Sequence, residues 1–306
     1  MTSTSRRPLV ILGPTASGKS DVAMAYAAAH AGSEIIVVDA MQVYRRMDIG
    51  TAKPSAADRT AVPHFGMDLC EPSDDFAVTD FERSATAAVA DIATRGGRAV
   101  VVAGTGLYLR SLTDPMEIPG KWPEVRAVVE ARVGTEGSAA LHRELVALDP
   151  VAASRMEPSN ERRVVRALEV TLGSGRPFSS FGPGMDQYPP VEFEQVGLQW
   201  PRDVLTARIA ERVYRMMAAG LLAEVEGLLG EPLPLSRSAR QALGYKELIE
   251  HLAGGVSLDE AVASVILRTR QFAVRQERWF RRDPRIRWVQ IEHDPVAEVL
   301  AVLQPT

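Results

Sequence analysis

A glycine-rich segment near the beginning of the chain has the residue types and spacing of a phosphate-binding loop. Residues 13–20 read GPTASGKS and fit the pattern G-x-x-x-x-G-K-[ST]. In such a loop, backbone N–H groups and the positive end of the next helix surround phosphate oxygens, a lysine neutralises charge and a hydroxyl suits Mg²⁺. Lys19 and Ser20 hold these two positions, so the segment predicts a diphosphate or polyphosphate site with Ser20 as metal ligand. The alternative, a glycine turn with a chance lysine, arises in about one chain in a hundred of this length.

A second candidate for chemistry is Asp39, which ends the strand-like run from Ile35. The carboxyl ends of parallel strands share one edge of an open α/β sheet, and ligands bind there. We therefore expect Asp39 to lie beside the phosphate loop, which follows the run Leu9 to Leu12. A carboxylate in that place could act as a general base or hold a metal ion. An aspartate that only caps a loop is the alternative.

The elements that must position these residues alternate along the first third of the chain. Apolar runs at Leu9–Leu12, Ile35–Asp39 and Arg98–Ala103 are typical of parallel strands buried on both faces. Between them, residues 20–31 and 76–95 are rich in alanine and predict helices. This alternation predicts an α/β fold with a parallel sheet.

Beyond residue 112 the pattern changes. Breaker residues cluster between Pro115 and Pro123, helical stretches follow at 124–133, 136–148, 150–156 and 161–172, and glycines and prolines recur from 173 to 190. We therefore expect a first part of the core in residues 1–115, an inserted helical domain in 116–194 and a second, mostly helical part of the core in 195–306. In that last part, Ser257 and Glu260 form a capping box that opens a helix to about Arg282, and residues 286–291 predict a final strand.

Composition sets limits on what the protein can be. The chain has 306 residues, 46% of them hydrophobic and 24% charged, as in an ordinary globular protein. The single cysteine, Cys70, excludes an internal disulfide framework and a cysteine-rich zinc site. Because no apolar run has the length of a signal peptide or a membrane span, we expect a cytoplasmic protein without membrane contact.

The charge of the chain is unevenly distributed. The net charge is −4, which by itself argues mildly against a nucleic-acid partner. Residues 268–287, however, hold eight arginines against Glu277 and Asp283. Arg268, Arg275 and Arg282 recur every seven residues along one side of the predicted helix. This basic segment favours contact with phosphates, and a solvated helix face is the alternative.

Several strings of residues resemble, in order, the successive motifs of the tRNA dimethylallyltransferases, also called tRNA isopentenyltransferases. The first are GPTASGKS at 13–20, VDAMQVY at 38–44, DIGTAKP at 48–54 and GTGLY at 104–108. The later ones are DPVAA at 149–153, RRVVRALEV at 162–170, GYKE at 244–247 and TRQFAVRQ at 269–276. They span nearly the whole chain, and DIGTAKP is far more specific than the phosphate loop. Ala103 and Ala40 depart from the usual pattern, where glycine and serine are common.

The resemblance implies a P-loop core with an inserted helical domain that binds tRNA. It implies transfer of a dimethylallyl group from dimethylallyl diphosphate to N6 of the adenine at position 37, next to the anticodon, with Mg²⁺ as cofactor. A stacked base cannot reach the phosphate loop, so the adenine must be flipped out. A P-loop kinase acting on a small molecule or nucleotide is one alternative, and an RNA-binding protein with an inactive P-loop is another. We expect a monomer.

The resemblance also implies roles for single residues. Asp39 would receive the N6 proton, and Thr105 and Lys19 would stand beside the reacting groups. Arg126 rests on a short match, and a solvated helix arginine is its alternative; His64 has a family counterpart but is as well explained as a structural residue. The diphosphate-binding positions are Gly13, Pro14, Thr15, Ala16, Ser17, Gly18, Lys19 and Ser20. The positions that match tRNA-contacting residues are Asp39, Ala40, Met41, Gln42, Thr105, Arg126, Arg162, Arg163, Val164, Val165, Arg166, Arg240, Gly244, Tyr245 and Lys246.

Overall fold

The computed structural model describes residues 6–182, 184 and 187–303, and these residues form two compact units. Unit 1 comprises the chain up to Thr113 and from Pro190 onward, and unit 2 comprises Asp114–Pro189. The predicted ends of the helical insertion, 116 and 194, differ from these by a few residues.

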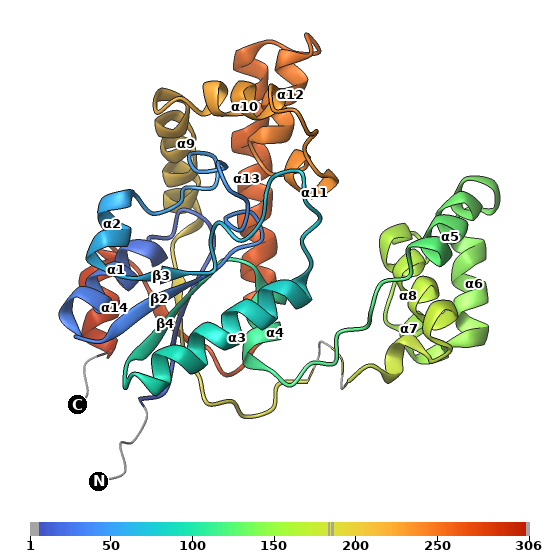
Figure 1. The fold of residues 1–306 in the computed structure, drawn as a ribbon, viewed down its shortest axis with the longest axis horizontal. Helices are drawn as coiled ribbons and strands as arrows, with labels where there is room; N and C mark the ends of the chain where they lie inside the picture. The colour runs from blue at the N-terminus through green and yellow to red at the C-terminus, as the bar shows by residue number, and fades with distance from the viewer. Residues whose placement is uncertain (1–5, 183, 185–186, 304–306) are drawn as a thin grey trace. The chain divides into compact units, whose positions relative to one another are not determined.

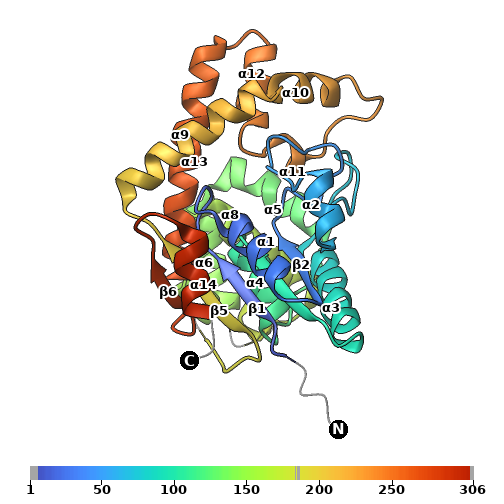
Figure 2. The same ribbon diagram turned by 90° about the vertical axis from the view of Figure 1, so that its left-hand side faces the viewer.

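Unit 1 is built on a six-stranded parallel sheet with the order β3-β2-β4-β1-β5-β6 (Figures 1 and 2). Its strands are β1 (Leu9–Leu12), β2 (Ser33–Val38), β3 (His64–Phe65), β4 (Arg98–Ala103), β5 (Glu194–Gln199) and β6 (Arg287–Gln290). Three strands end in register, because Leu12 and Val38 both pair with Ala103. The loops that follow β1, β2 and β4 therefore emerge side by side.

Alternate residues of the central strands enter different cores, as the two-residue period of a strand requires. Val10 and Ile36 pack in one core with helix α3 (Val78–Thr94), and Leu9 and Ile35 pack in the other with α1 (Lys19–Ala29) and α14 (Pro295–Leu303). The sheet is thus covered on both faces. This explains why β1 and β4 are mainly apolar on both faces and could be predicted from local sequence.

The described part of unit 1 contains seven further helices. They are α2 (Ala56–Ala61), α4 (Gly106–Thr113), α9 (Arg202–Ala218), α10 (Leu221–Leu229), α11 (Arg237–Arg240), α12 (Tyr245–Leu252) and α13 (Leu258–Phe280). The capping box predicted at Ser257 and Glu260 is confirmed. Strand β3 and helices α2 and α4 were not predicted, because they are short and carry little periodic signal. None of the helices described is both long and apolar enough to cross a membrane.

Unit 2 contains α5 (Pro123–Glu136), α6 (Ser138–Leu148), α7 (Pro150–Ser154), α8 (Glu161–Ser174) and the 3-10 turn η1 (Phe178–Ser180). Its core includes the side chains of Leu141, Leu145 and Leu168. Asp149 begins α7 by accepting the Ala152 N–H at 2.9 Å. These helices agree closely with the predicted stretches, because each carries its own capping or breaker residues.

Candidate active site

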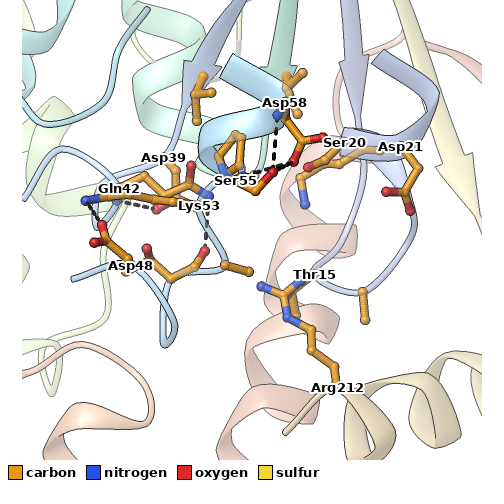
Figure 3. Close-up of a pocket in the computed structure, with 18 of the residues that line it drawn as sticks. Thr15, Ser20, Asp21, Asp39, Gln42, Asp48, Lys53, Ser55, Asp58 and Arg212 are labelled. Atoms are coloured by element: carbon orange, nitrogen blue, oxygen red, sulfur yellow. Dashed lines mark hydrogen bonds and ion pairs between the residues drawn. The ribbon is translucent and has the colours of Figure 1, made fainter. Parts of the chain in front are cut away.

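A cleft of about 1310 Å³ opens at the carboxyl edge of the sheet, where the loops after β1, β2 and β4 meet (Figure 3). Its walls also include the segment 48–59 and one face each of α9 and α13. All of these elements belong to unit 1.

The predicted phosphate loop forms one end of the cleft. Gly18 precedes α1 with φ = 90°, a left-handed conformation that favours glycine. Two carbonyl groups of the loop accept hydrogen bonds from side chains far along the chain. Trp200 Nε1 donates to Ser17 O and Arg208 Nε donates to Ala16 O, both at 2.9 Å. The first N–H groups of α1 have no carbonyl partner within the helix and can receive an anion.

The ammonium group of Lys19 is buried and lies near another cation. Burial and the nearby Arg212 lower the pKa of Lys19 to about 8, and Asp39 and Asp21 oppose this effect. The cationic groups of Lys19 and Arg212 at this end of the cleft would therefore be stabilised by a bound anion. A diphosphate would be such an anion.

Helix α9 supplies cations that sequence reasoning missed. Arg208, Arg212 and Arg215 all line the cleft, and their spacing of four and three residues places them on one helix face. Arg212 projects from α9 into the cleft (Figure 3), and burial lowers its pKa. The spacing was visible in the sequence, but nothing there showed which way this face points.

Asp39 and Thr105 lie close together because the adjacent strands β2 and β4 end in register. Asp39 Oδ1 accepts the N–H groups of Met41 at 2.8 Å and Gln42 at 3.3 Å. Thr105 Oγ1 accepts the N–H of Ala40 at 3.3 Å. These bonds fix the orientation of the Asp39 carboxylate and hold the 39–42 turn against the end of β4.

Lys19 and Asp39 both lie close to Gly104. A β-carbon placed on Gly104 would lie 3.5 Å from Lys19 Cε and 3.6 Å from Asp39 Oδ2. The lysine of the phosphate loop and the candidate base therefore stand on either side of one small space. Ala103, where the family usually has glycine, is a buried strand residue outside the left-handed region, so its methyl group causes no backbone strain.

Gln276 on α13 joins two walls of the cleft and was given no role in the sequence analysis. Its Oε1 accepts the Thr15 N–H at 2.9 Å, and its Nε2 donates to Gly104 O at 2.7 Å. The side chain is buried and lines the cleft. It connects the phosphate loop directly to the end of β4.

The DIGTAKP string forms another wall of the cleft. Lys53 Nζ pairs with Asp48 at 2.8 Å and with Asp68 at 2.6 Å, and its side chain is almost fully buried. Lys53 therefore holds the loop together. Gln42 Nε2 donates to Thr51 O at 3.0 Å, while Gln42 Oε1 is buried without a hydrogen-bond partner in the described chain.

His64 lies on β3, where its Nδ1 is 2.7 Å from Val62 O. Burial lowers its pKa, which favours the neutral ring. These contacts describe a structural residue at the margin of the cleft.

The arginines of unit 2 proposed to bind RNA fall into two groups. Arg126 Nη1 and Arg166 Nη1 bind the buried carboxylate of Glu169 at 3.2 and 2.7 Å. Arg162 and Arg163 are exposed, and neither side chain has a hydrogen bond or ion pair with another described residue. The second pair is available for phosphate. In the first pair, Arg126 joins α5 to α8, and Arg166 joins α8 to the carbonyl groups of Pro119 and Gly120.

Three residues with predicted RNA contacts have buried side chains. Val164 and Val165 belong to the core of unit 2, and Tyr245 has no exposed surface. These side chains pack in the interior and have no surface to offer an RNA, so a contact at these positions would come from backbone atoms, and their RNA contact stays a prediction. The motif strings carry scaffold residues as well as contact residues, and the sequence does not separate them.

Of the candidate RNA-binding residues near α11 and α12, Arg240 and Lys246 have exposed surface and Gly244 is buried. Arg240 is exposed at the end of α11, Lys246 is half-buried on α12, and Gly244 precedes α12 with φ = 89°. Along α13, Arg275 is exposed and lies over the Phe272 ring, and Arg268 pairs with Glu247 at 3.2 Å.

The donor set at the phosphate loop fits a magnesium ion that arrives with a diphosphate. Within the described part of the chain, no three His, Cys, Asp or Glu side chains lie close enough to hold a metal ion by themselves. Mg²⁺ needs no such cage, because it is commonly bound by one or two protein oxygens together with substrate phosphates and water. Ser20 is exposed, lines the cleft and stands in the first turn of α1.

Comparison with known proteins identifies related sequences. The family model described as IPP transferase matches residues 42–283, and that described as isopentenyl transferase matches residues 7–62. The tRNA dimethylallyltransferase of Geobacter metallireducens is 46% identical over 288 residues, which cover 93% of this chain and 92% of the relative. That of Kineococcus radiotolerans is 46% identical over 288 residues, with 92% and 90% covered.

Solved structures give the same result. A tRNA isopentenylpyrophosphate transferase from Bacillus halodurans superposes with a TM-score of 0.69 at 35% identity, covering 97% of this chain and 94% of the other. A eukaryotic dimethylallyltransferase acting on tRNA gives a TM-score of 0.77 at 26% identity, with 94% and 74% covered. The chain belongs to the IPP transferase family.

Proposed function

We propose that this protein is a tRNA dimethylallyltransferase, which transfers a dimethylallyl group from dimethylallyl diphosphate to N6 of adenine 37 in tRNA. The products are N6-isopentenyladenosine and diphosphate. One observation carries the proposal: Lys19 of the phosphate loop and the carboxylate of Asp39 flank the same small space at Gly104. An anion site and a proton acceptor at that separation suit a reaction that releases diphosphate while an amine loses a proton. The comparisons give no support to a kinase.

At the diphosphate end, the first backbone N–H groups of α1 surround the phosphate oxygens. Lys19 and Arg212 neutralise the charge that develops as the carbon–oxygen bond of the substrate breaks. Ser20 would hold Mg²⁺ together with the diphosphate, and the bound ion would neutralise further charge on the leaving group.

At the amine end, Asp39 accepts the N6 proton when the new carbon–nitrogen bond forms. Its Oδ1 is held by two backbone N–H groups, so Oδ2 remains for the substrate. Thr105 stands beside it and fixes the same turn through Ala40. Gln42 lies next to Asp39 and lines the cleft with its amide held by Thr51 O, so it forms part of the wall against which the base would lie.

The base must leave the stack of the anticodon loop to reach this space. We propose that unit 2 binds the anticodon stem-loop, with Arg162 and Arg163 on phosphates, and that the basic face of α13 contributes as well. Because these contacts are electrostatic, RNA affinity should fall steeply as salt rises. We further propose that the protein acts as a monomer in the cytoplasm, where its RNA substrate is found.

A transfer assay tests the proposal. Labelled dimethylallyl diphosphate, Mg²⁺ and a stem-loop RNA with adenosine 3′ to the anticodon should yield labelled RNA. The same RNA with guanosine at that position should stay unlabelled. Absence of label with the adenosine RNA, under conditions in which an authentic enzyme of the family is active, would refute the function.

A further inference from the structure

A single carboxylate outside the cleft holds the loop that forms one of its walls. Glu224, on α10, accepts three consecutive backbone N–H groups, those of Asp48 at 2.9 Å, Ile49 at 2.7 Å and Gly50 at 3.1 Å. The hydroxyl of Tyr245 donates to Glu224 Oε1 at 2.5 Å. Neither Glu224 nor Tyr245 lines the cleft. Hydrogen bonds to a carboxylate are stronger than those between neutral groups, so three of them hold this loop firmly and the fourth, from Tyr245, holds the carboxylate.

The Tyr245 ring also determines the shape of the loop. A β-carbon on Gly50 would lie 2.5 Å from Tyr245 Cε2, so the backbone at this point approaches the ring as only glycine permits. Tyr245 is fully buried, and burial raises the pKa of its phenol. The phenol therefore stays protonated and remains a hydrogen-bond donor to Glu224.

The loop in turn determines how Gln42 faces the cleft. Thr51, the residue after Gly50, accepts the Gln42 Nε2 hydrogen bond through its carbonyl at 3.0 Å. A carbonyl only accepts, so the nitrogen of the amide must face Thr51 and the oxygen must face away. Gln42, Asp48 and Lys53 lie on the same side of the cleft (Figure 3).

We propose that Glu224 and Tyr245 are positioning residues for adenine recognition: they fix the 48–51 loop, which holds the side chain of Gln42 in the wall of the cleft. This inference rests on the proposed function. It assigns to the GYKE string a purpose other than RNA contact, since Tyr245 acts through Glu224 and the loop. The phosphate loop shares none of these hydrogen bonds, so binding of diphosphate should not depend on them.

The test compares Glu224→Gln and Tyr245→Phe with two matched controls that make the same chemical changes at exposed positions. Glu226→Gln lies two residues away on α10, and Tyr214→Phe alters an exposed tyrosine on α9. Steady-state transfer gives kcat/KM for the stem-loop RNA, and calorimetry gives the dissociation constant of dimethylallyl diphosphate. We expect Glu224→Gln to lower kcat/KM for RNA about tenfold, the size expected for one charge-assisted hydrogen bond. Diphosphate affinity should change less than about twofold, and both controls should behave as wild type.

A double-mutant cycle separates positioning from general support of the fold. If Glu224 acts through Gln42, then Glu224→Gln should cost little more in a Gln42→Ala background. Additive losses, or equal losses of diphosphate affinity, would overturn the inference. If Glu224→Gln fails to fold, Tyr245→Phe, which removes only a hydroxyl group, is used for the same measurements of kcat/KM and diphosphate affinity. A wild type that transfers no label overturns the proposed function and this inference together, whereas an active wild type with unaffected variants overturns only the inference.

Discussion

The charge state of Lys19 predicts a pH limit on diphosphate binding. Burial and Arg212 lower the pKa of Lys19 from its ordinary value of 10.5 to about 8 in the substrate-free cleft. At pH 9, about one tenth of the molecules would therefore carry a charged Lys19. Because the diphosphate binds the charged form, its association constant should fall about tenfold for each pH unit above 8, until the pKa of the complex is reached.

Two neighbours of Lys19 should move this limit in opposite directions. Arg212 lowers the pKa of Lys19, so Arg212→Ala should shift the alkaline limit to higher pH even though it weakens binding overall. Asp39 raises the pKa, so Asp39→Asn should shift the limit to lower pH. A general effect of damage to the cleft would move both variants in the same direction.

Calorimetric titration with dimethylallyl diphosphate between pH 6.5 and 10 measures the effect without requiring catalysis. Lys19→Ala is the control, because any slope that persists in it comes from ionisation of the ligand or of the metal-bound water. The reasoning is refuted if the wild type shows no slope beyond that control. It is refuted equally if Arg212→Ala and Asp39→Asn move the limit the same way.

Three further predictions follow from the contacts around the cleft and in unit 2. Asp39→Ala should lower kcat by about 10²- to 10⁴-fold while leaving diphosphate binding in place; loss of folding, measured by circular dichroism, would contradict its role as a base. Gly50→Ala should lower the free energy of unfolding by about 1–3 kcal/mol in urea, because its methyl group would overlap the Tyr245 ring. Arg162→Ala should reduce the salt dependence of RNA binding by about one phosphate contact, whereas Arg166→Ala should leave that slope unchanged and lower thermal stability.

The central fold was predictable because its signals are local. Strands Leu9–Leu12 and Arg98–Ala103 have the predicted bounds, since both faces of the sheet are covered and each run is therefore apolar throughout. The position of Asp39 followed from the same reasoning, because parallel strands place their carboxyl ends on one edge. Short elements such as β3, with two residues, give no periodic pattern to detect.

Side-chain partners across long sequence separations were not predictable. Gln276 binds Thr15, which lies 261 positions earlier in the chain, and Arg208 binds Ala16 across 192 positions. Spacing within a helix shows which residues share a face, but only packing decides what that face meets. The cations of α9 were missed for this reason, although their sequence spacing was plain.

A family motif contains both residues that bind the substrate and residues that support the fold. The structure distinguishes the two kinds by their burial and by the pairing of their charges. Lys19, at the cleft, has a lowered pKa and no ion pair with a carboxylate of the described residues, which leaves its charge for a substrate. Lys53, in the most specific string, is almost fully buried against two carboxylates, so its charge is already used within the protein. The same distinction divides Arg162 from Arg166. A cation whose charge the fold has already balanced supports the site, and we propose that one whose charge is unbalanced binds the diphosphate or the RNA.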